Sequence, residues 1–160
     1  MLNLLPFVTP LVNFIEGAID SCRDSVIPAV GSIVYCDMYF GYAEHSGVYI
    51  GNNQIVHLNG NGLIEVVSPK EFMANTTAIN IYVSCEGSYA SGEQYVADNA
   101  LQMLGEFRNY NIITDNCHQF TVGCINGDFD NSCSFMWMLK DEIKKHLGTN
   151  TWRQCDSNFY

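Results

Sequence analysis

The sequence has few positive charges. Only 7 of its 160 residues are lysine or arginine, against 17 aspartates and glutamates, and the formal net charge is −10. Binding to nucleic acid needs a basic surface that neutralises phosphates, so this composition argues against a nucleic-acid partner. An acidic surface is also repelled by anionic lipid headgroups. If the protein contacts a membrane, we expect apolar side chains to make that contact.

Long apolar runs and linker-like segments are missing as well. No stretch of about 18 consecutive apolar residues occurs, so we expect no transmembrane helix. The apolar segment 1–12 carries no basic residue and no obvious cleavage site, which argues against a signal peptide. No linker rich in Pro, Gly or Ser and no internal repeat divides the chain. We therefore expect a single domain over 1–160.

Cysteine is abundant, but its spacing does not indicate a metal site. The chain contains cysteine at positions 22, 36, 85, 117, 124, 133 and 155, with no CxxC pair among them. This argues against a zinc ribbon and a thioredoxin motif, and we expect neither a metal nor a cofactor. A chain of this size does not need disulfides to be stable, so we expect mostly reduced thiols and a cytoplasmic location. Most of these cysteines are expected to be small buried hydrophobic residues.

Hydrophobic spacing and turn residues predict an α+β fold, with helices packed on an antiparallel sheet. The predicted strands are 32–36, 45–50, 54–58, 63–67 and 78–84. The predicted helices are one from Thr9-Pro10, a short one after the capping box Ser68–Glu71, one from a second capping box at Ser91–Gln94 to Gly105, one capped by Thr114 or Asp115, and one over 135–147 closed by Gly148. The tail 149–160 has no clear period, and we expect it to be loosely held.

Cys117 has the most favourable setting for a reactive thiol. It lies in the first turn of a predicted helix, where free backbone N–H groups and the helix dipole favour the thiolate. The same N–H groups could hold an oxyanion. The alternative interpretation is a buried structural cysteine at a helix start.

Two histidines flank one predicted turn. If that turn has three residues, 51–53, Ile50 pairs with Gln54. His45 and His57 then lie on one face of the sheet as diagonal neighbours, and Gly47 leaves room for a ligand between them. A two-residue turn would place the two histidines on opposite faces. The pairing of the histidines therefore depends on the length of the turn.

Four segments of the sequence, taken together, resemble one protein family. They read GSIVY, HSGVYIG, IVHLNG and LGEFRNYNIITDNCHQF, in that order. This set resembles the LRAT-like proteins, which are lecithin:retinol acyltransferase and its relatives, circularly permuted members of the papain-like NlpC superfamily. The family pattern is a His that opens a strand, a second His on the next strand, and a Cys within Asn-Cys-Glu-His-Phe. The resemblance covers about 31–126 and implies one LRAT-like catalytic domain, with a permuted papain-like fold and helical extensions at both ends.

The resemblance implies roles for individual residues. Cys117 would be the nucleophile, His45 its base, and His57 the group that orients His45. Asn116 falls on the family's Asn before the Cys, where it would act as a structural cap. The implied reaction is acyl transfer through a thioester acyl-enzyme, with a phospholipid as the acyl donor, as in a phospholipase or acyltransferase.

The chain departs from the family motif directly after Cys117. It has His118-Gln119 where the family usually has Glu-His. We expect these positions to shape the pocket, so the departure affects the substrate more than the mechanism. Adjacent residues on a helix do not face each other, so His118 is expected to be structural or pocket-lining and not to be the base.

Two other classes of function fit the same residues. One is a cysteine amidase or peptidase, as in papain-like relatives, acting on an amide or ester in a polar cleft. The other is a non-catalytic interaction module that keeps the fold without the activity. The expected partners are thus a lipid or an amide or ester substrate, with peripheral membrane contact and no nucleic acid. The sequence does not determine the oligomeric state.

Overall fold

The structure is a computed structural model that describes residues 24–111 and 116–160. Its antiparallel sheet has the order β4-β3-β2-β1-β5-β6, and β7 also pairs with β5. The strands are β1 (Ile33–Met38), β2 (Ala43–Gly51), β3 (Gln54–Leu58), β4 (Ile64–Val67), β5 (Ile81–Glu86), β6 (Tyr89–Ala90) and β7 (Thr151–Gln154). The helices are α2 (Pro69–Phe72), α3 (Gln94–Gln102), α4 (Cys117–Asn126) and α5 (Met136–Leu147), with short 3-10 turns η1 (Tyr39–Gly41) and η2 (Ser157–Phe159). The α+β prediction is confirmed, while the helix predicted from Thr9-Pro10 lies outside the described residues.

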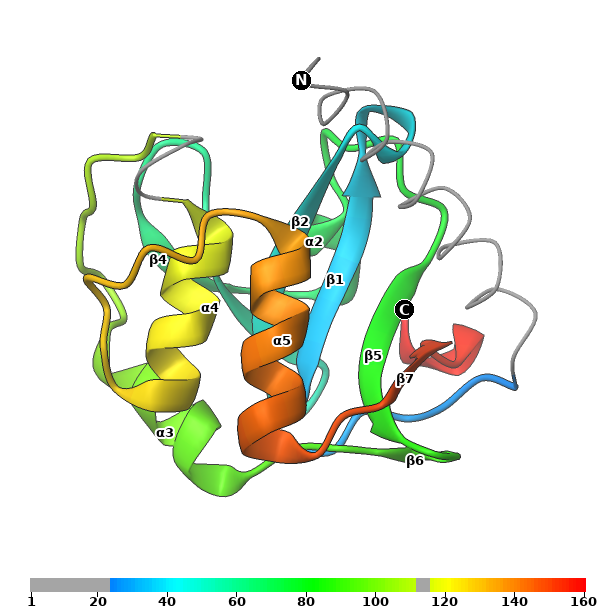
Figure 1. Cartoon of the computed structure of the whole chain (residues 1–160). Coiled ribbons are helices and arrows are strands. Elements are labelled where there is room, and N and C mark those ends of the chain that lie inside the picture. Colours follow the sequence, from blue (N-terminus) through cyan, green and yellow to red (C-terminus); the bar gives the residue numbers. More distant parts are fainter. Residues whose placement is uncertain (1–23, 112–115) are drawn as a thin grey trace, which may run out of the picture.

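The sheet separates two apolar clusters (Figure 1). Helices α3, α4 and α5 pack on one face, whose core includes Val48, Val56, Phe120 and Leu139. The short helix α2 contributes Phe72 to the other face, together with Tyr49 and Ile55. Consecutive residues of a strand point to opposite faces, as Val48 and Tyr49 do. As a result α4 and α2 approach the β2–β3 hairpin from opposite sides.

The β2–β3 hairpin has a turn of a different length from the one predicted. Gly51 pairs with Gln54, so Asn52 and Asn53 alone form the turn. Both have a positive φ, 52° for Asn52 and 56° for Asn53. This is the conformation of the two-residue turns that match the twist of a hairpin. The register shifts between Tyr49 and Gly51, which marks a β-bulge.

The bulge restores the pairing that a three-residue turn would have produced. Beyond it Tyr49 pairs with Ile55 and Val48 with Val56. Continued by one residue, this register sets His57 opposite Gly47, so His45 and His57 lie on the same face. The predicted length of the turn is therefore wrong, because the turn has two residues and the third lies in the bulge of β2. The prediction that His45 and His57 share one face of the sheet is right, because the bulge shifts the register by the same one residue.

The helix boundaries test the predicted caps. Ser68 and Glu71 form the predicted capping box at α2. The second predicted box is wrong, because α3 starts at Gln94 after Glu93, without a side-chain cap. Ser91 instead places its hydroxyl 2.6 Å from the hydroxyl of Thr149. Helix α3 ends at Gln102, short of Gly105, whereas Gly148 closes α5 with a φ of 65° as predicted.

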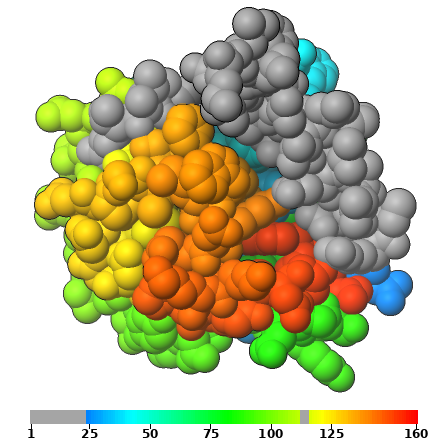
Figure 2. All heavy atoms as spheres, in the orientation of Figure 1, coloured from blue at the N-terminus to red at the C-terminus, as the bar shows by residue number. Residues whose placement is uncertain are grey.

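The C-terminal tail is held firmly, in contrast to the prediction. Its strand β7 pairs with β5, and the buried Trp152 packs edge-on against Tyr35 with ring centroids 5.0 Å apart. The Tyr160 hydroxyl accepts a hydrogen bond of 2.8 Å from the Ile81 N–H. In Figure 2 the C-terminal segment, in red, lies beside the orange α5 on the surface. A four-residue strand is too short for a periodic signal, and its partner lies far away in the sequence.

Within residues 24–111 and 116–160, none of the helices has the length and apolar character needed to cross a bilayer.

Candidate active site

Cys117 is the first residue of α4, as the sequence predicted. The helix is capped by Asn116, whose Oδ1 accepts hydrogen bonds from the backbone N–H of His118 at 2.9 Å and of Gln119 at 3.3 Å. The Gln119 Oε1 in turn accepts a hydrogen bond of 3.0 Å from the Asn116 N–H, which completes a capping box. The cap is therefore Asn116, and the predicted caps Thr114 and Asp115 lie outside the described residues.

This cap changes the expected oxyanion donors. Two first-turn N–H groups, those of His118 and Gln119, are already bonded to Asn116 Oδ1. The prediction that the free N–H groups of this turn hold an oxyanion therefore needs correction. The cap does not use the N–H of Cys117 itself, the other N–H of this turn that lies next to the sulfur.

The Cys117 sulfur lies beside the backbone of β2. Its Sγ is 3.9 Å from the carbonyl oxygen of Glu44, and the residue is only 3% exposed. Burial by itself would raise the pKa of Cys117. The charge and hydrogen bond of the His45 side chain, together with the N–H and hydroxyl of Ser46, outweigh burial and lower that pKa overall. The surroundings of Cys117 thus favour a thiolate.

His45 and His57 are in direct contact. His45 Nε2 lies 2.5 Å from His57 Nδ1, and both side chains are buried. On its far side His57 Nε2 is 3.4 Å from Glu65 Oε1, the residue directly across on β4. Asn59 Nδ2 donates to the same carboxylate oxygen at 2.7 Å. These residues form a polar line that runs across three strands.

The protonation of this line follows from burial. Burial lowers the pKa of His57 more than Glu65 raises it, so His57 is neutral near pH 7. A neutral His57 that accepts from His45 through Nδ1 carries its own proton on Nε2, which lies near Glu65 without forming a hydrogen bond to it. His45 then uses Nε2 for His57, which leaves its Nδ1 as the nitrogen available to Cys117. This arrangement can receive a proton from the thiol at His45.

Phe72 covers both histidines. Its ring centroid is 4.7 Å from that of His45 and 5.6 Å from that of His57. A Cβ atom on Gly47 would meet Ile55 Cγ2 and Val56 O at 2.9 Å and the Phe72 ring at 3.1 Å. The space over Gly47 is therefore filled by protein, and the expectation that it admits a ligand is wrong. Sequence reasoning missed Phe72, since the capping box predicts its helix and not the face that this helix covers.

A second polar group meets Cys117 from the α4 side of β2. Ser46 points toward α4, where its Oγ is 2.8 Å from His118 Nδ1 and 3.1 Å from Thr121 Oγ1. The Thr121 hydroxyl donates to the carbonyl of Cys117 at 2.8 Å. His45, one residue earlier on β2, points to the opposite face. The sulfur thus lies between polar groups from both faces of the sheet.

The two residues that depart from the family motif have different surroundings. Burial lowers the pKa of His118 to about 4, so His118 is neutral near pH 7 and too weakly basic to replace His45 as the base. It does approach the nucleophile, with Nδ1 3.9 Å from Cys117 Sγ, so the argument that adjacent helix residues stay apart is wrong at this helix start. Gln119 was expected to shape the pocket; it binds Asn116 and the carbonyl of Asn131 instead.

Tyr110 is a half-buried residue near the site that sequence reasoning missed. Burial raises the pKa of its phenol to about 12, with further contributions from the charges of Cys117 and Tyr39. The phenol therefore lies within electrostatic range of the Cys117 sulfur. No hydrophobic period or cap singles it out in the segment 105–111, and only its nearness in sequence to Cys117 could have suggested it.

The remaining described cysteines are ordinary core residues. Four of them are buried and Cys133 is half-buried, and all are free thiols. Burial raises the pKa of Cys36 and of Cys155 to about 12. Among the residues that the structure describes, no three His, Cys, Asp or Glu side chains are grouped so that they could hold a metal ion.

Comparison with known families adds one finding. The family described as "Lecithin retinol acyltransferase" matches residues 27–130, which is more than half of the chain. Among curated proteins, none matches this sequence. The matched range contains His45, His57 and Cys117 and extends through α4, while α5 and β7 lie beyond it.

Proposed function

Because this chain belongs to the lecithin retinol acyltransferase family, we propose that it is a cysteine-dependent acyltransferase or hydrolase. In this proposal Cys117 is the nucleophile, His45 is its base and His57 orients His45. The observation that carries it is the buried line from Cys117 through His45 to His57, with the His ring nitrogens 2.5 Å apart. The lowered pKa of Cys117 supports the same roles.

The first half of the reaction forms an acyl-enzyme. The Cys117 proton passes to His45, and the sulfur attacks the carbonyl carbon of an ester or amide. A C–S bond forms while the carbonyl π pair moves to oxygen, near the N–H of Cys117. When the tetrahedral intermediate collapses, the bond to the leaving oxygen or nitrogen breaks, and His45 returns its proton to that atom. The product is a thioester on Cys117.

The second half transfers the acyl group. Water or another acceptor gives a proton to His45 and attacks the thioester carbon. The C–S bond then breaks, and the proton moves from His45 to the Cys117 sulfur. His57 holds the His45 ring in place through both halves and stays neutral throughout, consistent with its lowered pKa.

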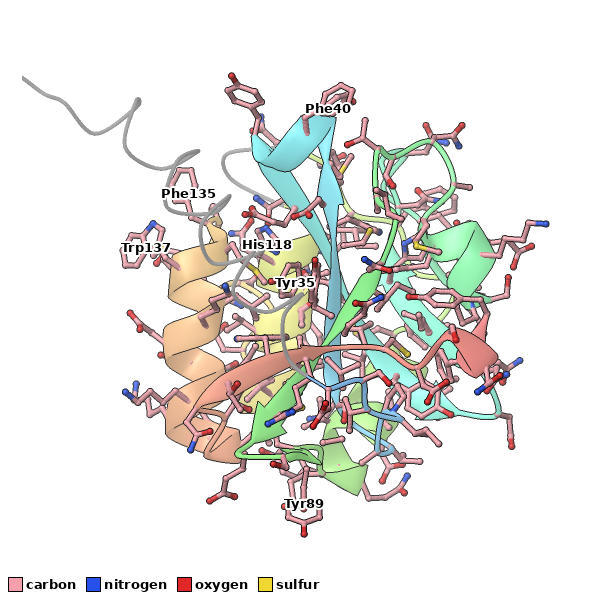
Figure 3. The ribbon with its side chains drawn as sticks, turned by 90° about the vertical axis from the view of Figure 1, so that its right-hand side faces the viewer. Tyr35, Phe40, Tyr89, His118, Phe135 and Trp137 are labelled. Carbon is pink, nitrogen blue, oxygen red and sulfur yellow. The ribbon has the colours of Figure 1, made fainter. Side chains whose placement is uncertain are left out.

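The proposed acyl donor is a phospholipid. Three exposed aromatic residues support contact with a lipid surface: Tyr39, Phe40 and Tyr42, which we call the aromatic rim, are 61%, 83% and 73% exposed. They lie in the connection between β1 and β2, at the end of β2 that leads into His45. Phe40 stands at this end of the molecule in Figure 3, opposite Tyr89. Aromatic residues are favoured at membrane interfaces, and such contact needs no positive charge.

We also propose that 1–160 forms a single catalytic domain. The described elements on the C-terminal side of the family match are packed on the matched part. Helix α5 packs on α4, and β7 extends the sheet beside β5.

Intact-protein mass spectrometry after incubation with a phospholipid mixture tests the proposed function. We expect an adduct of one acyl chain on the wild type and none on Cys117→Ala. His146→Ala is a matched histidine control, because His146 pairs with Glu142 at 3.3 Å on α5, away from the site. An adduct formed only from amide or peptide substrates would favour the amidase class. No adduct from any of these substrates would favour a non-catalytic interaction module.

A further inference from the structure

A second histidine lies at the Cys117 thiol, on the side opposite His45. His118 projects from α4 into the interior (Figure 3), with Nδ1 3.9 Å from Cys117 Sγ and 2.8 Å from Ser46 Oγ. We propose that His118 is a positioning residue that carries its proton on Nδ1 and turns the Ser46 hydroxyl toward the Cys117 thiolate. This inference rests on the proposed function of Cys117 as the nucleophile, and it adds a residue to the site that the family motif does not contain.

The hydrogen count around Ser46 carries the argument. The Ser46 hydroxyl has one hydrogen to donate and can accept two hydrogen bonds. Thr121 already donates to the Cys117 carbonyl, yet its Oγ1 lies 3.1 Å from Ser46 Oγ. If His118 Nδ1 had no proton, Ser46 would have to donate its single hydrogen to His118. No hydrogen of Ser46 would then be left to face the sulfur.

A proton on His118 Nδ1 resolves this arrangement. His118 then donates to Ser46, and the Ser46 hydrogen is left for the Cys117 thiolate. Thr121 can keep its hydrogen bond to the Cys117 carbonyl in either tautomer, so its contact with Ser46 does not decide between them. A buried thiolate that loses a hydrogen-bond donor is costly, so a proton on His118 Nδ1 is the tautomer that suits an ionised Cys117.

The charge state of His118 fits the same role. Burial lowers its pKa to about 4, so near pH 7 the ring carries one proton, whose position the neighbours decide. Burial has the largest effect on the pKa of Cys117 and raises it, whereas His45 lowers it. The Ser46 N–H and hydroxyl lower this pKa further. The thiolate is therefore stabilised from both faces of β2, by His45 on one and by Ser46 on the other.

Several titratable groups face this site, so a single pH profile cannot isolate His118. His45 acts on Cys117 from β2, and Tyr110 lies close enough to Cys117 for their charges to interact. His57 acts behind His45, and Glu44 also acts on His118. A comparison between variants of His118 and Ser46 keeps the other groups constant.

The test is the pH dependence of Cys117 alkylation by iodoacetamide in the full chain, with the labelled peptide identified by mass spectrometry. We expect His118→Leu and Ser46→Ala each to raise the midpoint of the profile by about 1 to 2 pH units, because a hydrogen bond to a charged group is lost. The double variant should shift no further than the larger single shift. His118→Asn keeps an N–H close to the position of Nδ1 and should retain most of the wild-type midpoint.

Two results would overturn the inference. A midpoint unchanged in His118→Leu but raised in Ser46→Ala would show that His118 only packs. Equal shifts of the alkylation midpoint in His118→Asn and His118→Leu would show that the Nδ1 proton has no role. If the variants do not fold, long-range proton–nitrogen NMR correlations of wild-type His118 decide the tautomer directly, and a proton on Nε2 overturns the inference.

The same profiles separate this inference from the proposed function. A wild-type midpoint equal to that of an ordinary cysteine would contradict the activated nucleophile, and with it the role of His118. A low wild-type midpoint that His118→Leu leaves in place would contradict the inference alone.

Discussion

At the scale of single residues, the ring nitrogens distinguish the two histidines of the hairpin. His45 is bonded to His57 through Nε2 and acts on Cys117, whereas His57 lies between His45 and Glu65. We expect His45→Ala to abolish acyl-enzyme formation almost as fully as Cys117→Ala. His57→Gln retains an acceptor for His45 and should keep part of the rate, since general acid–base help is worth ~10²–10⁴-fold.

Single-turnover acylation measures both variants, with circular dichroism as the check on folding. If folded His45→Ala acylates at the normal rate while His57→Gln forms no acyl-enzyme, the two histidines have the opposite roles. If neither change affects the rate, the proposed enzyme function is wrong.

The cysteines should also differ in reactivity. The pKa of Cys117 is lowered, while burial raises that of Cys36 and Cys155 to about 12 and also raises that of the half-buried Cys133. Because only the thiolate reacts, we expect Cys117 to be alkylated first among the described cysteines at pH 7. Peptide mapping after limited iodoacetamide treatment measures the order. Equal labelling of Cys133 and Cys117 would argue against an activated thiolate.

At the scale of elements, the β2–β3 hairpin depends on Gly47. Gly47→Ala would press a methyl group against the backbone oxygen of Val56, the Ile55 side chain and the Phe72 ring. The backbone of a paired strand has little freedom to move, so we expect a loss of about 1–3 kcal/mol in the free energy of unfolding. Gly60→Ala is the matched control, because a Cβ there meets nothing within 4 Å.

Urea denaturation of the two glycine variants provides the measurement. We expect the change for Gly60→Ala to stay within about 0.5 kcal/mol. Equal stability of both variants would mean that Phe72 does not close the space over Gly47.

At the scale of the whole molecule, stability should fall in acid through the buried histidines. The pKa of His118 is about 4 in the folded protein, against about 6.5 in an unfolded chain. Between these values the unfolded state binds more protons, so the free energy of unfolding decreases as pH falls from 6.5 to 4. The His118 share is about 3 kcal/mol over that window, and His57 adds to it with the same sign.

Urea unfolding at pH 7 and pH 4.5 measures this dependence. His118→Asn carries no titrating ring, so its stability should depend less steeply on pH than that of the wild type. Identical pH dependence in the two proteins would contradict a buried neutral His118.

The aromatic rim makes a prediction about membrane contact. Burying one phenylalanine side chain in the interface is worth about 1.5–3 kcal/mol, so Phe40→Ser should weaken binding to phosphatidylcholine vesicles about tenfold or more. Tyr89→Ser is the control, because Tyr89 is 81% exposed at the opposite end of the molecule (Figure 3). Vesicle co-sedimentation measures both. Equal losses for the two variants, or no binding by the wild type, would overturn the proposed contact.

Much of the local structure was determined by the sequence itself. The bounds of β3, the capping box of α2, the Gly148 end of α5 and the position of Cys117 at a helix start all follow from short-range patterns. Caps and strand periods involve residues within about four positions of one another, so a single chain segment contains the whole signal. The same reasoning identified Cys117, His45 and His57 as the candidate site, and the family resemblance assigned their proposed roles.

Only the tertiary structure decided which groups meet. The bulge before Gly51, the Phe72 ring over His45 and His57, and the approach of α4 with His118 to Ser46 join elements far apart in the chain. The pairing of β7 with β5 likewise depends on a partner strand about seventy residues away. No local period encodes the face of the sheet that a helix covers, because that choice depends on burying the apolar surface of all the elements together.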